Sequence, residues 1–213
     1  ADDDEALCRA RAADAVWLAG GDQSQYLLAW PSSWQTTLAT PSTRTIGGTS
    51  AGAMVLGAFA FDAALGSVTS STALQSPRGA SLSLRRSAFA QPELDGVIVD
   101  THFSARDREG RLLAFMTRIA TDEGEESVIG VGVDERTAAV VEAGTLSVFA
   151  NDGGAVWLYR LVSAGDVDTE PLTGVRAERL RLGDGDMVSW PFDWSTTSAD
   201  VIHVDDGAVL PGP

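Results

Sequence analysis

The sequence predicts an α/β fold in which helices flank a mostly parallel sheet, with an antiparallel extension at the C-terminal end. Three short apolar runs, at residues 15–18, 96–100 and 128–133, have the length and composition of buried strands, and polar turn residues follow each of them. From Thr137 onward the apolar runs alternate along the chain, and Asn151-Asp152-Gly153-Gly154 is a strong hairpin signal. Parallel strands in the first part and antiparallel strands after it follow from these patterns.

In the first part of the chain, short helices and strands alternate. Residues 3–13 are typical of the end of a helix, and residues 25–30 open another helix that the following proline limits. Residues 42–46 predict a short strand, because threonine and isoleucine favour extended backbone. Residues 53–61 are apolar enough for a buried helix, and residues 66–92 indicate an excursion over the surface with room for short strands.

A further helix is predicted to begin at Ser104, where Asp107 completes a capping-box arrangement. The core face of this helix has helical spacing and consists of Leu112, Phe115, Met116 and Ile119. Arg106 and Arg108 fall in the first turn, where the helix dipole disfavours cations, so we expect an anion beside them. That anion is either a ligand or a neighbouring acid of the protein.

Composition sets limits on the class of protein. The chain has 213 residues, of which 44% are hydrophobic, so one domain spanning residues 1–213 is the simplest organisation. Its net charge of −15 argues against nucleic-acid partners and anionic membranes, and no stretch approaches the roughly 20 apolar residues of a membrane helix. One cysteine and two histidines argue against a metal cluster, and we expect no cofactor. The N-terminus does not resemble a signal peptide, which favours a cytoplasmic address and leaves a secreted one open if a leader has been removed.

Gly48-Thr49-Ser50-Ala51-Gly52 fits the G-x-S-x-G pattern of a nucleophile elbow. In that motif a serine occupies a tight turn between a strand and a helix, and small flanking residues let the backbone bend. The backbone N–H of Ala51 is then a natural oxyanion donor, joined by an N–H of Gly20 or Gly21. Ser50 is therefore the candidate nucleophile.

A serine nucleophile needs a base, and the base needs an acid that orients it. Of the two histidines, His102 at a strand end is favoured over His203, which lies in an alternating strand near the C-terminus. Three carboxylates remain open as the acid: Glu135, which is favoured, Asp134 and Asp62.

Four separated motifs resemble those of cyanophycinases and related peptidase E-type serine peptidases. They occur in the family's order and are Gly20-Gly21-Asp22-Gln23, Gly48-Thr49-Ser50-Ala51-Gly52-Ala53, Asp100-Thr101-His102-Phe103-Ser104 with the arginines after it, and Gly132-Val133-Asp134-Glu135-Arg136-Thr137-Ala138. The resemblance implies a class I glutamine amidotransferase-like fold, a Ser50 nucleophile and a His102 base. It also implies a substrate pocket that includes Gln23, Asp100, Thr101, Arg106, Arg108 and Arg111.

The resemblance suggests cleavage of short aspartyl peptides or of the β-linked aspartyl-arginine units of cyanophycin, often by a homodimer. Two features depart from the family. Thr101 replaces the usual glutamine of the pocket, and the family fold has further strand–helix units before the Gly-Gly-Asp-Gln turn. The chain therefore reads as processed or truncated, or as taking those strands from elsewhere, since proteins avoid exposed edge strands.

The leading hypothesis is thus a serine peptidase acting on aspartyl or isoaspartyl peptides. An esterase or acyl hydrolase is an alternative, because G-x-S-x-G also marks those enzymes. The order serine, histidine, acid differs from the serine, acid, histidine order of α/β-hydrolases, unless Asp62 is the acid. A non-catalytic binding module of amidotransferase-like fold is the third hypothesis.

Overall fold

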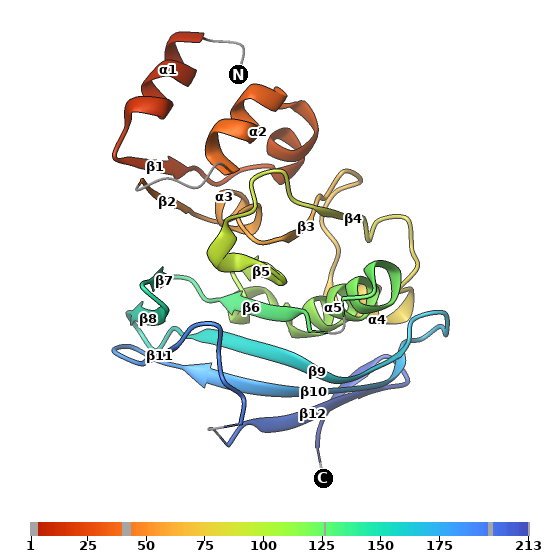
Figure 1. Ribbon diagram of the computed structural model, residues 1–213. Coiled ribbons are helices and arrows are strands. Elements are labelled where there is room, and N and C mark those ends of the chain that lie inside the picture. The colour runs from red at the N-terminus through yellow and green to blue at the C-terminus, as the bar shows by residue number, and fades with distance from the viewer. Residues whose placement is uncertain (1–3, 40–43, 126, 196–197, 213) are drawn as a thin grey trace.

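The computed structural model describes residues 4–39, 44–125, 127–195 and 198–212, and shows helices and strands in layers around one large sheet (Figure 1). The sheet has eight strands in the order β13-β12-β10-β9-β6-β5-β3-β4. These strands are β3 (Phe59–Phe61), β4 (Leu84–Arg86), β5 (Val97–Thr101), β6 (Ile129–Val133), β9 (Val156–Asp166), β10 (Thr173–Leu182), β12 (Asp200–Asp205) and β13 (Ala208–Pro211). This mixed α/β arrangement is compatible with the predicted fold class.

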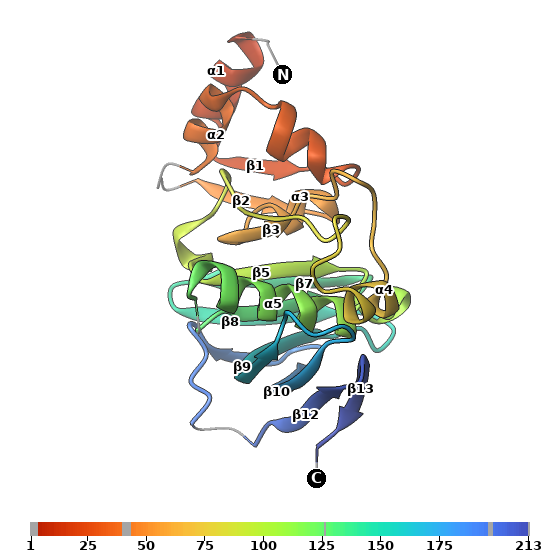
Figure 2. The same cartoon turned by 90° about the vertical axis from the view of Figure 1, so that its right-hand side faces the viewer.

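Strand direction changes within the sheet. β3, β5 and β6 run parallel to one another, whereas β4 and the C-terminal strands β9, β10, β12 and β13 pair antiparallel with their neighbours. Two further strands, β1 (Ala15–Leu18) and β2 (Thr45–Gly48), form a separate parallel pair that Figure 2 shows beyond β3, toward the N-terminal end of the molecule. The carboxyl ends of the parallel strands carry the polar turns singled out above.

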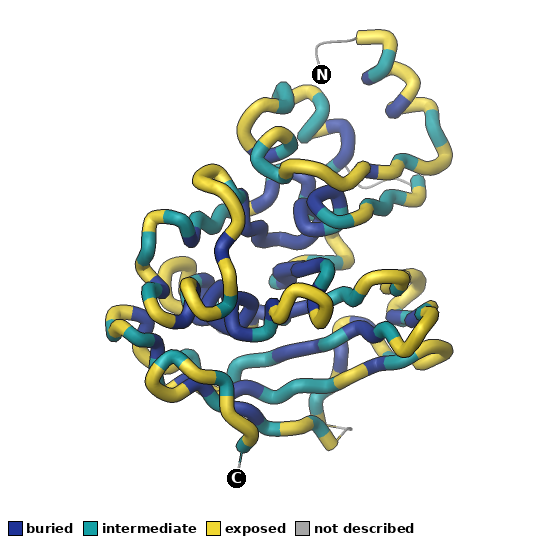
Figure 3. Tube along the Cα trace, turned by 180° about the vertical axis from the view of Figure 1, so that it is seen from behind, coloured by how far each residue is buried: buried dark blue, intermediate teal, exposed yellow. Residues whose placement is uncertain are grey.

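Alternation along β5 explains how the sheet is covered on both faces. Ile98 packs in a cluster with α5 (Glu109–Glu123) and α4 (Ser70–Gln75) on one face. Val97 and Val99 pack on the other face in a second cluster. That cluster includes residues of a small three-stranded sheet, which is formed by β7 (Thr137–Glu142), β8 (Thr145–Ala150) and β11 (Met187–Ser189). Figure 3 shows buried residues both along the large sheet and in the part of the molecule nearer the N-terminus.

The remaining helices lie near the N-terminus, with a third cluster of buried residues beneath them. They are α1 (Asp4–Ala12), a π-helical turn at Gln25–Ala29, α2 (Ser32–Ala39) and α3 (Ala51–Met54), and two short 3₁₀ turns lie later at Pro92–Leu94 and Ser104–Arg106. Within the described ranges, no helix is both long and apolar enough to cross a bilayer.

Several local predictions in the first part of the chain need correction. Residues 53–61 do not form one helix, because α3 ends at Met54 and β3 begins at Phe59. Gly57 lies between them, where a side chain would come within 2.7 Å of the Val97 carbonyl oxygen, so a close backbone approach replaces the helix. Strand β1 is only partly buried, because Ala15 and Trp17 are exposed and Leu18 is buried. Among the described strands it pairs with β2 alone. The predicted strand at residues 42–46 lies partly outside the described residues, and Thr45 and Ile46 belong to β2.

The helix predicted from Ser104 begins five residues later, at Glu109. Asp107 adopts a left-handed conformation (φ 48°) that interrupts the helix, and the Ser104 N–H is bound by Asp134 instead of by a capping box. The predicted core face is confirmed, since each of its four side chains is at most 1% exposed. The excursion at residues 66–92 contains α4 and β4 and contributes Leu74 and Phe89 to the core.

Candidate active site

Ser50 occupies a sharp turn between β2 and α3. Its backbone has φ 52° and ψ −120°, a conformation that costs free energy for a non-glycine residue and is found at functional turns. A side chain on Gly48 would overlap the backbone of Gly52, and one on Gly52 would overlap the carbonyl of Leu18. Both glycines of the G-x-S-x-G pattern are therefore required by close packing, which presses the turn against the end of β1.

His102 follows directly after β5 and faces Ser50. The distance between Ser50 Oγ and His102 Nε2 is 2.9 Å, a normal hydrogen bond. His102 also has positive φ (51°), so the chain turns sharply at the base as well as at the serine. The turns after β2 and β5 thus bring the Ser50 hydroxyl and the His102 imidazole together, although the two residues are 52 positions apart in the sequence.

Glu135 follows β6 and completes the chain of contacts. Its Oε1 lies 2.8 Å from His102 Nδ1, so the ring donates to the carboxylate and leaves Nε2 free to accept from Ser50. The hydrogen bond to His102, helped by the positive charges of Arg106 and Arg136, lowers the pKa of Glu135 below its ordinary value. Glu135 is therefore ionised at neutral pH, although its side chain is 53% exposed.

Asp62 and Asp134, the other carboxylates considered as the acid that orients His102, have different partners. Asp62 is fully buried and binds Arg85 and Ser83 at the sheet edge. Asp134 accepts from the backbone N–H groups of Ser104 and Ala155. The second histidine, His203, lies within β12, opposite Arg176 in the register. Neither it nor these acids contacts the imidazole of His102 among the described residues.

The Gly-Gly-Asp-Gln turn lies beside the serine. A side chain on Gly20 would come 3.2 Å from Ser50 Cβ, which shows how closely this turn approaches the nucleophile. Gly21 has φ +143°, and the exposed Asp22 accepts the Ser24 N–H and stabilises the turn. The hydrogen bond to Ser24 lowers the pKa of Asp22. Gln23 is half-buried on the same turn, and Ala51 begins α3 immediately after Ser50.

Three of the residues expected in the substrate pocket bind one another instead. Asp100 is fully buried, and its carboxylate accepts two hydrogen bonds of 2.6 Å from Arg111, which is 2% exposed. Arg108 donates to the same carboxylate at 3.1 Å, and burial lowers the pKa of Arg108 to about 10, so it stays charged at neutral pH. The anion expected beside Arg108 is thus an internal carboxylate. This geometry favours a supporting role for all three.

The side chains of Arg106 and Thr101 take no part in these hydrogen bonds, although the backbone of Thr101 binds both Asp100 and Arg108. Arg106 is exposed, and its guanidinium forms no hydrogen bond or ion pair with any other described residue, yet its positive charge lies close enough to Glu135 to lower the pKa of that carboxyl. Thr101 is 6% exposed, and its hydroxyl has no hydrogen-bond partner within the described part of the chain. Arg106 therefore offers a free cation beside the Ser50–His102–Glu135 contacts.

Gly132, the next-to-last residue of β6, packs against the residue after His102, a contact that sequence reasoning missed. A side chain there would come 2.6 Å from the ring of Phe103, the residue after His102. Phe103 is 3% exposed and also packs on Tyr159. The signal available in the sequence was the alternation Gly130-Val131-Gly132 inside an otherwise apolar strand, which often marks a close approach.

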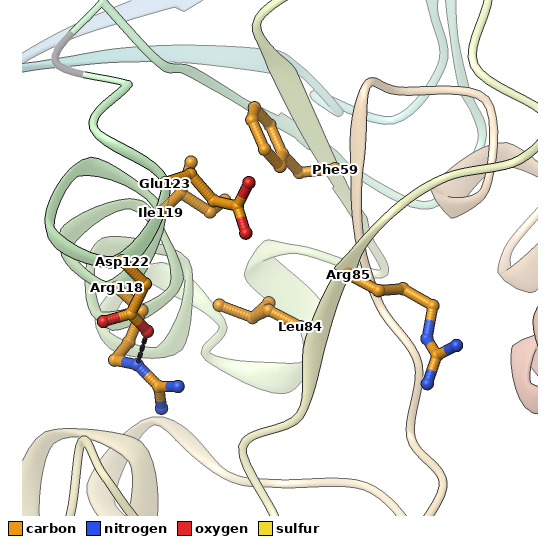
Figure 4. A pocket seen from close by; sticks show the side chains of 7 residues that line it. All are labelled: Phe59, Leu84, Arg85, Arg118, Ile119, Asp122 and Glu123. Carbon is orange, nitrogen blue, oxygen red and sulfur yellow. Dashed lines mark hydrogen bonds and ion pairs between the residues drawn. The ribbon is translucent and has the colours of Figure 1, made fainter.

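A small cavity of about 40 Å³ lies away from the serine, between β3, β4 and the C-terminal half of α5 (Figure 4). Its lining includes Phe59, Leu84 and Ile119, with charged groups of Arg118 and Asp122 at the edge. The start of β3 and the end of α5 place it at the opposite end of the sheet from His102. It is too small for a peptide. Among the described residues, no group of three or more His, Cys, Asp or Glu side chains is arranged to hold a metal.

A serine on a strained elbow, an imidazole and a carboxylate in hydrogen-bonded sequence are the arrangement that serine hydrolases use. The chain is similar to two curated cyanophycinases, one from Synechococcus elongatus and one from Thermosynechococcus vestitus. Each is 31% identical to it over 195 residues, which cover 87% of the chain and 56% of the relative. The chain thus spans a little over half the length of these relatives. No protein-family profile matches it. The chain is therefore similar, over most of its own length, to proteins named cyanophycinase.

Proposed function

We propose that the protein is a serine-type peptidase that cleaves aspartyl or isoaspartyl peptides, including β-Asp-Arg units, through an acyl-enzyme. The observation that carries this proposal is the continuous contact from Ser50 through His102 to Glu135, at 2.9 and 2.8 Å. The similarity to cyanophycinases supplies the substrate class, and we assign the domain to the class I glutamine amidotransferase-like fold on the same ground.

In the proposed reaction, His102 Nε2 takes the proton of Ser50 as the hydroxyl oxygen attacks the scissile carbonyl. Glu135 holds the Nδ1–H and stabilises the imidazolium that forms. The N–H groups of Ala51 and Gly21 receive the developing oxyanion, because one follows the nucleophile and the other lies on the turn beside it. His102 then protonates the leaving amine, and a water molecule, activated by the same imidazole, releases the acyl group from Ser50.

Substrate charge is recognised by the groups that remain free around the serine. The exposed guanidinium of Arg106 is suited to a carboxylate, which it can bind in a bidentate manner. Asp22 and Gln23 lie on the turn beside Ser50, where an acidic and an amide side chain suit an arginyl group of the substrate. The buried Asp100 holds Arg108 and Arg111 in place behind this surface.

The experiment that tests the proposal compares the purified protein with Ser50→Ala on β-Asp-Arg, on α-Asp-Xaa dipeptides and on a p-nitrophenyl ester. We expect peptide turnover that disappears in the variant. Turnover that is unchanged in Ser50→Ala, or hydrolysis of no peptide, contradicts the proposal. Ester hydrolysis without peptide hydrolysis would identify an esterase instead.

A further inference from the structure

The carboxylate of Asp134 connects three segments around the candidate base. Its Oδ1 accepts the Ser104 N–H at 2.8 Å, and its Oδ2 accepts the Ala155 N–H at 3.1 Å and the Trp157 Nε1–H at 3.3 Å. The Asp134 N–H in turn donates to the Ala155 carbonyl at 3.0 Å. One side chain thus ties the loop after β5 to the start of β9.

These hydrogen bonds hold the backbone beside both His102 and Glu135, the two residues whose side chains are in contact. Ser104 is two residues after His102, and Glu135 is the residue directly after Asp134. The Glu135 side chain is 53% exposed, and the hydrogen bond to His102 is the one that its carboxylate forms among the described residues. The position of its backbone therefore contributes to the orientation, and Asp134 anchors that backbone on its N-terminal side.

We propose that Asp134 is a positioning residue, which holds His102 and Glu135 in register without touching the substrate. This inference rests on the proposed function. Both carboxylate oxygens are needed, because one accepts from the loop after β5 and the other from β9. An asparagine has the same shape but only one accepting oxygen, so either segment is left facing an N–H₂ group.

The test uses Asp134→Asn in the full chain, with Asp184→Asn as the matched control. Asp184 also accepts a backbone N–H from a distant segment, that of Ala150 at 2.8 Å, but it lies in the turn between β10 and β11 and forms no hydrogen bond with Ser50, His102 or Glu135 among the described residues. A fluorophosphonate probe that labels reactive serines gives the labelling rate, and its end point gives the number of active sites. We expect Asp134→Asn to slow labelling by ~10²-fold with an unchanged end point, because displacements of about 1 Å in a catalytic site have such effects. We expect Asp184→Asn to leave the rate unchanged.

A double-mutant comparison separates positioning from simple destabilisation. If Asp134 acts through Glu135, adding Asp134→Asn to Glu135→Gln changes the labelling rate by less than about 3-fold. The same large factor in both backgrounds, an unchanged rate in the single variant, or an end point that falls with the rate would overturn the inference.

Proton NMR gives a readout that does not depend on turnover. The chain has only two histidines, so the Nδ1–H signal of His102 can be assigned with His102→Gln. We expect this signal in the native protein and in Asp184→Asn, and its loss in Asp134→Asn; its persistence there overturns the inference. Failure of the native protein to hydrolyse any peptide would refute the proposed function, whereas the NMR result still decides the role of Asp134.

Discussion

Replacing Gly132 with alanine should displace His102, the proposed base, and so lower activity. The substitution acts through Phe103, because Gly132 itself contacts neither Ser50 nor His102 directly. The new methyl group would come 2.6 Å from Phe103 Cγ and 2.7 Å from both Cδ atoms. Relief to an ordinary contact of about 3.4 Å requires a displacement of roughly 0.8 Å. The Phe103 ring is 3% exposed and packs on Tyr159, so it has little room to move away. The residue next to it, His102, must share the movement.

The expected cost follows from that displacement. Overpacking a core by one methyl group typically costs about 1–3 kcal/mol, which corresponds to a drop of roughly 2–12 °C in melting temperature for a domain of this size. A shift of this length at the imidazole should lower kcat on β-Asp-Arg by roughly 10- to 100-fold and leave KM nearly unchanged.

The assay measures kcat, KM and the melting temperature for the native protein, Gly132→Ala and a control, Gly183→Ala. At Gly183 the nearest heavy atom to a new methyl group is 3.6 Å away, an ordinary contact, so we expect kcat to stay within about 2-fold of native. Combining Gly132→Ala with Phe103→Leu should restore part of kcat, because the smaller side chain relieves the overlap. Native kcat in Gly132→Ala, or no recovery in the double variant, would refute the reasoning.

Three further predictions concern the charged groups. Arg111→Met should destabilise the fold by about 3–5 kcal/mol in urea unfolding, because it removes the main partner of the fully buried Asp100; a change under 1 kcal/mol would contradict this. Arg106→Gln should raise KM for β-Asp-Arg by roughly 10-fold with little change in melting temperature, since the exposed guanidinium binds no other described residue; an unchanged KM would exclude it from binding. Since the folded pKa of Glu135 is depressed, its contribution to stability is present above its ordinary value of 4.5 and is lost as pH falls through the lower folded pKa. The carboxyl carbon of Glu135 should titrate below 4.5 by NMR, and nearer 4.5 in His102→Ala; equal midpoints would show that His102 does not set this pKa.

The sharp turn at Ser50 could be predicted from sequence because its geometry is local. Gly48 and Gly52 are forced by overlaps within the turn and with the adjacent strand, and such constraints leave a short pattern in the chain. The core face of α5 was also predictable, because helical spacing alone selects Leu112 and Ile119. These are features that neighbouring residues determine.

The role of the arginines was harder to predict, because it depends on pairing across the fold. The sequence places Arg106 and Arg108 near a helix start, where a ligand anion and an internal acid are equally reasonable partners. In the structure, Asp100 at the end of β5 fills that position. Arg106, two residues away, stays exposed because the left-handed residue Asp107 interrupts the helix between them. The turn at Asp107 thus separates Arg108, which is buried against Asp100, from the exposed Arg106.

Which of Asp134 and Glu135 binds the His102 ring depends on the directions of two adjacent side chains just after the end of β6. Val133, the last residue of β6, pairs with Thr101, so the strand register ends level with the base. The Asp134 backbone continues the pairing with Ala155, which keeps its side chain among backbone N–H groups. The Arg136 backbone then turns with φ 57°, and Glu135 between them points to the imidazole. The pair therefore divides two tasks: one carboxylate binds the backbone of the loop that carries His102, and the adjacent one binds the His102 ring.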